Sequence, residues 1–222
     1  MTIEDRNMQD NSAVETGYWE NQERIYKRSY VSIALLVVNI VVFLLSNTAM
    51  LWLYEKGAMV TEIVLRDGQY YRLFSAMFLH ADPQHLFNNM MMLLLVGAIV
   101  ENYTGHAFFA FMYFLSGLFG NMISMAYEIN HSLSWISVGA SGAIMGLVGF
   151  VVVWIIINRR TFIRSRGMLI RLLFLAAFVI YACFFQAGAN TAAHLGGFVT
   201  GFVLGVINIV LLKNQKDMEG LA

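Results

Sequence analysis

The stretch SVGASGAIMGLVGFVVVWIII, residues 137–157, places a short polar segment before a run of apolar and glycine residues. From Ser141 onward the run holds no charged residue, and its length approaches the ~20 residues that a membrane-spanning helix needs. The glycines fall on one face of such a helix: Gly139, Gly142, Gly146 and Gly149. Because stripes of small residues let helix backbones approach closely in lipid, the stretch predicts a tightly packed transmembrane helix with a hydroxyl group at its start.

The rest of the chain has the composition of a polytopic membrane protein. Of its 222 residues, 59% are hydrophobic and 13% are charged. Six apolar runs predict transmembrane helices, at residues 31–45, 84–102, 108–127, 141–157, 168–185 and 191–212. The predicted fold class is therefore all-α, a bundle of six transmembrane helices. A long first loop, 46–83, mixes charges with aromatic residues and is expected to fold at the membrane interface.

The charged residues predict the domain boundaries and the orientation. They set off a polar tail at 1–28, a membrane domain at 29–213 and a second tail at 214–222. Lysine and arginine gather before the first helix, between the fourth and fifth helices and after the sixth. The positive-inside rule then places both termini in the cytoplasm, so the second, fourth and sixth helices begin at the outer face. The N-terminal segment resembles neither a secretory signal nor a transit peptide, and we expect an integral protein of a bacterial plasma membrane.

Several function classes are excluded by what the sequence lacks. The net charge is zero and no basic block is interleaved with aromatic residues, so no nucleic-acid partner is expected. A single cysteine, Cys183, leaves no internal disulfide pair. The sequence has no H-E-x-x-H motif and no pair of aspartates within the predicted spans, which argues against metalloprotease and aspartyl protease chemistry. We expect no metal and no cofactor.

Polar residues gather at the outer ends of three predicted helices. The helix at 84–102 carries His85 and Asn89, which are four residues apart and share one face. The helix at 141–157 begins with Ser141, and the helix at 191–212 has His194 near its first turn. Because these helices run in the same direction, the four side chains are expected at a similar depth. A channel or transporter would instead string its ionisable residues along a path through the membrane.

A second glycine stripe predicts that Ser141 and His194 meet. It lies on the last helix, below His194: Gly197, Gly201 and Gly205. If the two stripes face each other, His194 lies beside Ser141, and a neutral imidazole can take the hydroxyl proton during attack on a carbonyl. No aspartate lies in any predicted span, so the sequence offers a dyad without a third member. His85, Asn89 and the backbone amide of Ser141 are candidates to stabilise the oxyanion.

Structural roles compete with these chemical ones. Serines in membrane helices commonly bond to their own backbone, and Asn89 could join helices. His80, His106 and His131 are expected to be loop residues. Glu101, at the inner end of the second helix, is expected to hold the bundle together rather than to take part in chemistry.

Five separate motifs together resemble those of the rhomboid family of intramembrane serine proteases. They are GASGAIMG at 139–146, AHLGGFVTGFVLG at 193–205, HLFNNM at 85–90, YYRLFSAMFLH at 70–80 and GAIVE at 97–101. The resemblance implies Ser141 as nucleophile and His194 as base, with oxyanion donors at His85 and Asn89. It further implies structural roles for Arg72, Glu101, Gly139, Gly142, Gly197 and Gly201. Two positions depart from the family pattern: Tyr71 replaces tryptophan, and Met145 replaces an aromatic residue.

The resemblance also implies an activity. It is hydrolysis of a peptide bond in or beside the transmembrane segment of another protein, within the lipid bilayer. The fifth helix and the loop at 185–190 resemble a lateral gate and a cap. The alternative is a catalytically silent relative that binds or escorts transmembrane helices in the same groove.

Overall fold

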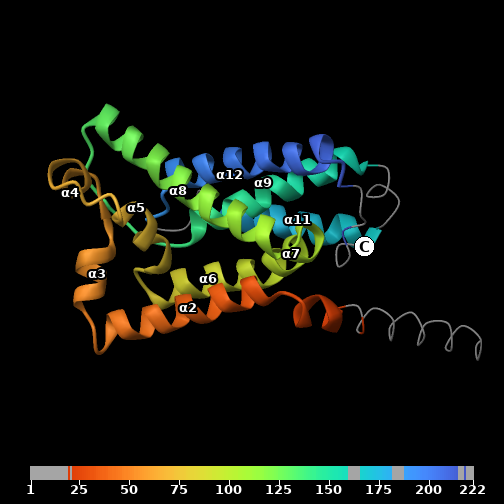
Figure 1. Cartoon of the computed structure of the whole chain (residues 1–222), viewed down its shortest axis with the longest axis horizontal. Helices are drawn as coiled ribbons and strands as arrows, with labels where there is room; N and C mark the ends of the chain where they lie inside the picture. Colours follow the sequence, from red (N-terminus) through yellow and green to blue (C-terminus); the bar gives the residue numbers. More distant parts are fainter. Residues whose placement is uncertain (1–19, 21, 160–165, 182–187, 215–217, 219–222) are drawn as a thin grey trace, which may run out of the picture.

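The computed structural model describes residues 20, 22–159, 166–181, 188–214 and 218. Helices dominate this part of the chain, and most of them run along the long axis of the molecule (Figure 1). They are α2 (Tyr30–Asn47), α6 (Pro83–Met92), η2 (Leu93–Gly97), α7 (Ala98–Thr104), α8 (His106–His131), α9 (Ser141–Ile157), α11 (Arg166–Ile180), α12 (Thr191–Val206) and η4 (Ile207–Leu211). The predicted all-α membrane fold is confirmed.

Each of the six predicted helices has a counterpart in the structure. The second is continuous from α6 through η2 to α7, and the sixth comprises α12 and η4. Within the described part of the chain, four helical segments are long and apolar enough to cross a membrane, namely Tyr30–Asn47, Pro83–Thr104, His106–His131 and Thr191–Leu211. The apolar helix α9 is shorter, with 17 residues. The predicted fifth helix is represented by α11, and residues 182–185 of that prediction lie outside the described residues.

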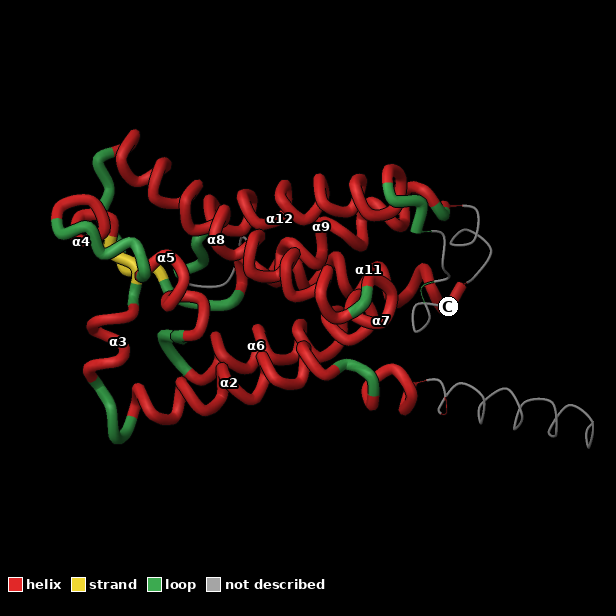
Figure 2. The backbone as a smooth tube through the Cα atoms, viewed as in Figure 1, coloured by secondary structure: helices red, strands yellow, loops and turns green. Residues whose placement is uncertain are grey.

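The long loop between α2 and α6 is folded, as the sequence predicts. It contains α3 (Trp52–Gly57), β1 (Met59–Val60), α4 (Thr61–Arg66), α5 (Arg72–Ser75) and η1 (Ala76–Phe78). Strand β1 pairs antiparallel with β2 (Ile136–Ser137), so that Met59 lies opposite Ser137 (Figure 2). The pair ties the loop to the segment that leads into α9. The sequence did not predict it, because two residues are too few to show the alternation of a strand.

Arg72 organises this loop from the inside. Its side chain is buried, and Nη1 donates hydrogen bonds to the carbonyl oxygens of Glu55, at 2.9 Å, and Ala58, at 2.7 Å. The neighbouring Tyr71 is exposed, and its hydroxyl donates to the carbonyl of Lys56 at 3.1 Å. A guanidinium buried against carbonyl oxygens satisfies groups that the loop would otherwise leave unpaired. These contacts fit the structural role expected of Arg72.

Helix α12 packs between α8 and α9, and its contacts with both are made through glycine. A Cβ atom added at Gly201 would overlap the carbonyl oxygen of Gly146, and one at Gly197 would overlap that of Gly142. On the other side, a Cβ at Gly120 of α8 would lie 2.7 Å from the carbonyl oxygen of Ala193. The predicted contact between the two glycine stripes is therefore present, and a second glycine contact with α8 adds to it.

Gly139 differs from the other glycines of the predicted stripe. It precedes α9, and its φ of +123° is a conformation that residues with a side chain rarely adopt. A Cβ there would lie 2.7 Å from both Cε1 and Nε2 of His85. Gly139 thus makes room for a ring on α6 rather than for the backbone of α12.

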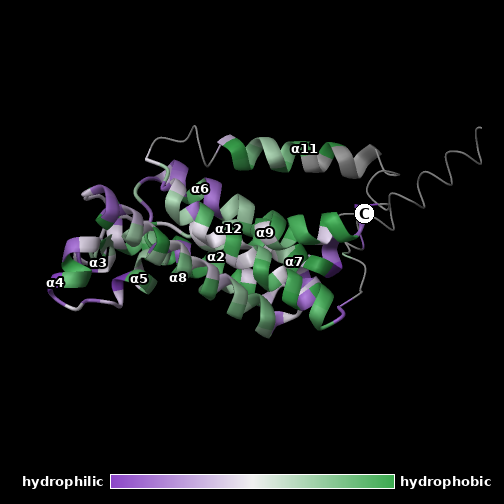
Figure 3. Ribbon diagram, turned by 90° about the horizontal axis from the view of Figure 1, so that it is seen from above, coloured by the Kyte–Doolittle hydropathy of each residue, from purple (hydrophilic) through white to green (hydrophobic). Residues whose placement is uncertain are grey.

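Helix α11 is attached to the bundle far more loosely. Seen from above, it lies to one side of the other helices (Figure 3). Leu173 and Phe174 are 70% and 74% exposed, whereas Leu175, Phe178 and Val179 pack partly buried against the core. Among the α11 side chains that the structure describes, the contact is made by Leu175, Phe178 and Val179, which lie along one face.

Glu101 holds the beginning of α2. The carboxylate is fully buried and accepts hydrogen bonds from the backbone amides of Val31, at 2.9 Å, and Ser32, at 2.7 Å. The first amides of a helix lack partners within the helix, so the carboxylate supplies them. His106, expected in a loop, instead begins α8, and its Nδ1 lies 2.6 Å from Glu101 Oε1. The contacts fit the structural role predicted for Glu101.

The ends of both predicted tails nearest the membrane domain are part of the fold. Residues 22–27 are helical, and Ile25 is buried with its carbonyl accepting from Asn102 at 2.8 Å. At the other end, the carbonyl of Asn214 accepts from the hydroxyl of Tyr103 at 2.6 Å. Residues 1–19, 21, 215–217 and 219–222 of the predicted tails lie outside the described residues.

Candidate functional site

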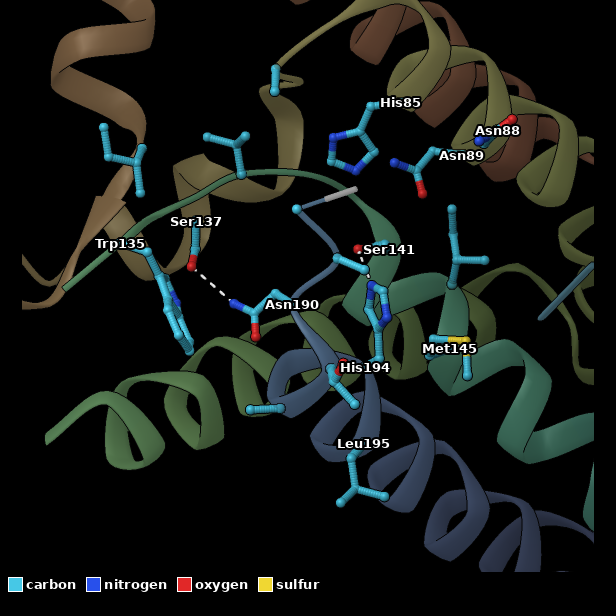
Figure 4. Close-up of a pocket in the computed structure, with 18 of the residues that line it drawn as sticks. His85, Asn88, Asn89, Trp135, Ser137, Ser141, Met145, Asn190, His194 and Leu195 are labelled. Atoms are coloured by element: carbon cyan, nitrogen blue, oxygen red, sulfur yellow. Dashed lines mark hydrogen bonds between the residues drawn. The ribbon is translucent and has the colours of Figure 1, made fainter. Parts of the chain in front are cut away.

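The hydroxyl of Ser141 and the imidazole of His194 lie within hydrogen-bonding distance. Ser141 is the first residue of α9, and His194 lies in the first turn of α12. The distance from Ser141 Oγ to His194 Nε2 is 2.8 Å (Figure 4). This proximity follows from the glycine contacts below it, which bring the two backbones together. The structure thus agrees with the spatial prediction from the two stripes.

The other ring nitrogen of His194 is not held by an acid. Nδ1 is buried, and no hydrogen-bond partner for it exists among the residues that the structure describes. A triad would place a carboxylate at this atom to fix the tautomer. The arrangement is that of a serine–histidine pair without a third member, in line with the absence of aspartate from the predicted spans.

His85 and Asn89 approach the same place from α6. Asp82 caps this helix by accepting from the backbone amide of His85 at 2.8 Å, and Pro83 occupies its first turn. In Figure 4 both side chains lie on the side of Ser141 opposite His194. Asn89 Nδ2 is buried and, within the described part of the chain, has no hydrogen-bond partner. A buried donor without a partner is costly unless a ligand receives it, so this atom is available to an incoming oxygen.

A cavity of about 710 Å³ connects these groups. One end carries the polar side chains of His85, Asn89, Ser141 and His194. Its other walls include Phe178 of α11 together with apolar and aromatic side chains such as Ile123, Tyr127, Trp135, Ile144 and Met145. An apolar cavity with a few convergent polar groups is the usual form of a ligand site, and this one lies between α11 and the bundle.

Met145 lies one turn after Ser141 on α9. Its side chain is 9% exposed and lines the cavity. Figure 4 shows it on the same side of the site as His194. The residue thus contributes to the apolar surroundings of the imidazole.

The polar network around Asn190 was not predicted. Asn190 precedes α12, and its Oδ1 accepts from the backbone amide of Ala193 at 3.0 Å. Its Nδ2 donates to Ser124 Oγ, at 2.6 Å, and to Ser137 Oγ, at 2.9 Å. The only sequence signal is an asparagine directly before a predicted helix, which is typical of an N-cap. Nothing in the sequence indicates the two distant serines.

His80 lies behind His85, outside the membrane-spanning segments. Its side chain is fully buried, and its ring centroid lies 5.1 Å from that of His85 in an edge-on contact. Burial, together with a smaller repulsion from His85, lowers the pKa of His80 to about 3. His80 is therefore neutral at physiological pH and packs against a proposed oxyanion donor. His131, also expected in a loop, is instead the last residue of α8.

No metal site competes with this reading in the described ranges, where no group of three or more histidine, cysteine, aspartate or glutamate side chains could hold an ion.

Comparisons with known proteins match most of the chain. A family model described as "Rhomboid domain" matches residues 67–210. "RHOMBOID-like protein 2" of Arabidopsis thaliana is 36% identical over 167 residues, 75% of this chain and 50% of the relative. "RHOMBOID-like protein 1" of the same plant is 31% identical over 160 residues, 72% of this chain and 40% of the relative. "Putative rhomboid protease YdcA" of Bacillus subtilis (strain 168) is 30% identical over 179 residues, 76% of this chain and 87% of the relative. The chain thus spans half or less of the plant proteins and most of the bacterial one.

Proposed function

This chain belongs to the rhomboid family, and we propose that it is an intramembrane serine endopeptidase. Its substrates are other membrane proteins, cut in or near their transmembrane segments. The observation that carries the proposal is the 2.8 Å contact between Ser141 Oγ and His194 Nε2 at the polar end of a cavity among apolar helices. A serine at a helix start needs no imidazole partner for structural reasons, whereas a nucleophile does.

The chemistry uses the pair in two steps. His194 Nε2 accepts the proton of Ser141 as Oγ attacks the substrate carbonyl carbon, and the same proton then passes to the leaving amine. A water molecule, activated by the same imidazole, hydrolyses the resulting acyl-enzyme. Water must therefore reach the pair, which accounts for a site at the ends of α6, α9 and α12 rather than at their middle.

The negative oxygen of the tetrahedral intermediate is stabilised by His85, Asn89 and the backbone amide of Ser141. Asn89 Nδ2 is the strongest of the three candidates, because it is buried and unpaired among the described residues. The amide of Ser141 lies at a helix N-terminus, where the helix dipole favours negative charge. Loss of one oxyanion donor typically costs about 2.7–4 kcal/mol in the barrier.

The substrate enters between α11 and the bundle. An intact transmembrane helix hides its carbonyls in its own hydrogen bonds, so the segment must unwind locally before attack. Glycine or other residues that weaken a helix favour this. The cavity wall formed by Phe178 and Val179 belongs to α11, whose described side chains pack only partly buried against the core, and we assign the lateral gate to it.

Both termini are proposed to lie in the cytoplasm, because lysine and arginine gather on that side of the predicted spans. A bacterial plasma membrane is the proposed location. Reporter fusions after residues 28, 133 and 213 of the chain test the orientation; a reporter active outside the cell at 28 or 213 contradicts it.

The function is tested with the purified full chain in liposomes that contain a single-span reporter. Wild-type protein is expected to cleave the reporter, while Ser141→Ala and His194→Ala abolish cleavage. Ser46→Ala is the matched control, because Ser46 Oγ donates to the carbonyl of Phe43 at 3.1 Å and accepts from Asn47 Nδ2 at 3.4 Å, and both partners belong to its own helix, α2. Undiminished cleavage by Ser141→Ala refutes the nucleophile. Tight reporter binding by the wild-type protein without cleavage favours the silent binder.

A further inference from the structure

One carboxamide joins the segments that lead to both members of the proposed catalytic pair. Ser137 precedes Ser141 by four residues, and Asn190 precedes His194 by four residues. Asn190 Nδ2 donates to Ser137 Oγ at 2.9 Å (Figure 4). The bond therefore connects the strand β2 that leads into α9 with the residue that caps α12.

The same carboxamide is anchored to α8. Its second Nδ2 bond goes to Ser124 Oγ at 2.6 Å, and Ser124 in turn donates to Glu128 Oε1 at 3.3 Å. Ser124 and Glu128 are fully buried. Thr61 of the long loop and Trp135, just before β2, lie beside the Glu128 carboxylate. The chain of contacts thus runs from the first loop through α8 to the start of α12.

The hydrogen bonds of Asn190 do more than cap the N-terminus of α12. An N-cap needs only the contact from Asn190 Oδ1 to the amide of Ala193, and serine would supply it equally well. Nδ2 is not needed for capping, yet both of its hydrogens are used, each on a side chain more than 50 residues away in sequence. The glycine contacts hold the bodies of α9 and α12, whereas this carboxamide fixes their first turns, where the reacting atoms lie.

We propose that Asn190 is a positioning residue that holds Ser141 and His194 at reacting distance by bonding to Ser137 and Ser124. The inference rests on the proposed function, since it concerns the rate at which that pair reacts. Misplacement of reacting groups by about 1 Å can cost on the order of 100-fold in rate, so the effect is measurable without any loss of fold.

The experiment measures how fast a small fluorophosphonate probe labels Ser141 in the purified full chain. Asn190→Ser keeps a capping oxygen for Ala193 but is too short to reach both serines. Ser137→Ala and Ser124→Ala remove the two acceptors one at a time. Thr200→Ala is the matched control, because Thr200 bonds only to its own helix, at the carbonyl of Gly196. Melting temperature is recorded for every variant, and kcat and KM are measured with the single-span reporter.

The expected result is a labelling rate about tenfold or more lower in Asn190→Ser, with kcat reduced and KM unchanged. The double variant Asn190→Ser/Ser137→Ala should react no more slowly than Asn190→Ser, because both changes break the same bond. Thr200→Ala should match the wild type. A general loss of packing would instead lower the melting temperature and alter KM as well.

Two results overturn the inference while leaving the proposed function intact. One is a wild-type labelling rate in Asn190→Ser, and the other is a double variant whose slowing equals the product of the two single effects. Failure of the probe to label Ser141 in the wild type has a different meaning, since it overturns the proposed function together with the inference.

Discussion

The contact between α9 and α12 and the contact between α11 and the bundle are opposites. In the first, glycines replace side chains, so that a Cβ at Gly197 or Gly201 would overlap a carbonyl oxygen of α9. In the second, Leu175, Phe178 and Val179 make partial contacts while Leu173 and Phe174 face outward. Close backbone packing leaves little freedom to move, whereas a few partly buried side chains can separate and return.

The difference teaches how one bundle can serve two needs. Two reacting atoms must stay within hydrogen-bonding reach, and the contact without side chains provides this. In the proposed function a transmembrane substrate enters from the lipid, and we assign that entry to the weakly packed helix α11. Side chains of α9, α12 and α11 all line the same cavity, so the tightly packed pair and the weakly packed helix both border the space that holds Ser141 and His194.

The largest effect is expected when a bulkier side chain is introduced into the glycine contact between α9 and α12. Gly201→Val places atoms where the carbonyl of Gly146 lies, and overpacking typically costs about 1–3 kcal/mol or more. We expect reporter cleavage to fall at least 100-fold, with a lower melting temperature in detergent. Gly205→Ala is the milder control, since its Cβ would lie 3.2 Å from Val153 Cβ and 3.3 Å from Phe150 Cα, which is tight but without the overlap found at Gly201. Equal, mild losses in both variants would contradict the account.

Crosslinking α11 to the bundle tests the second contact of the comparison, the loose one. Cysteines at Met92 of α6 and Phe178 of α11, which both line the cavity, are joined by a flexible bifunctional maleimide after replacement of Cys183 by alanine. We expect cleavage of the transmembrane reporter to fall about tenfold or more, because the gate cannot open. Labelling by a small fluorophosphonate should continue. Full reporter cleavage by the crosslinked protein would rule out α11 as the gate.

The hydrogen bonds of Glu101 to the start of α2 provide a polar helix contact that can be compared with the glycine contact between α9 and α12. Glu101→Leu leaves the amides of Val31 and Ser32 unpaired, and each unsatisfied buried group costs about 1–3 kcal/mol. We expect a lower melting temperature, measured in detergent. His106→Ala should cost less, because that imidazole is half exposed. Glu101 lies far along the helix from the site, so the variant that still folds should keep its labelling rate.

The smallest expected effect concerns pH. The pKa of His80 is lowered to about 3 by burial, from an ordinary value of 6.5. Between these values the unfolded chain binds a proton that the folded chain does not, so His80 makes stability fall as pH falls from about 6.5 towards 3. The melting temperature of His80→Asn should therefore depend less steeply on pH over this window. Identical slopes for variant and wild type would show that His80 does not contribute.

The sequence predicted what depends on period and spacing. Apolar length located the helices, and glycines spaced by three or four residues located the contact that unites Ser141 with His194. It could not predict the pairing of β1 with β2 or the bonds from Asn190 to Ser124 and Ser137, because these join isolated residues from distant segments. The same limit applies to Gly139, whose positive φ and contact with His85 depend on where α6 lies.

The most direct measurement is the site and rate of fluorophosphonate labelling, read by peptide mass spectrometry of the full chain in liposomes. The account predicts that the wild type is labelled on Ser141 and that His194→Ala loses this reaction while it keeps its helical content. Labelling of a different serine, or an undiminished rate on Ser141 without the imidazole, would contradict the assignment of this pair.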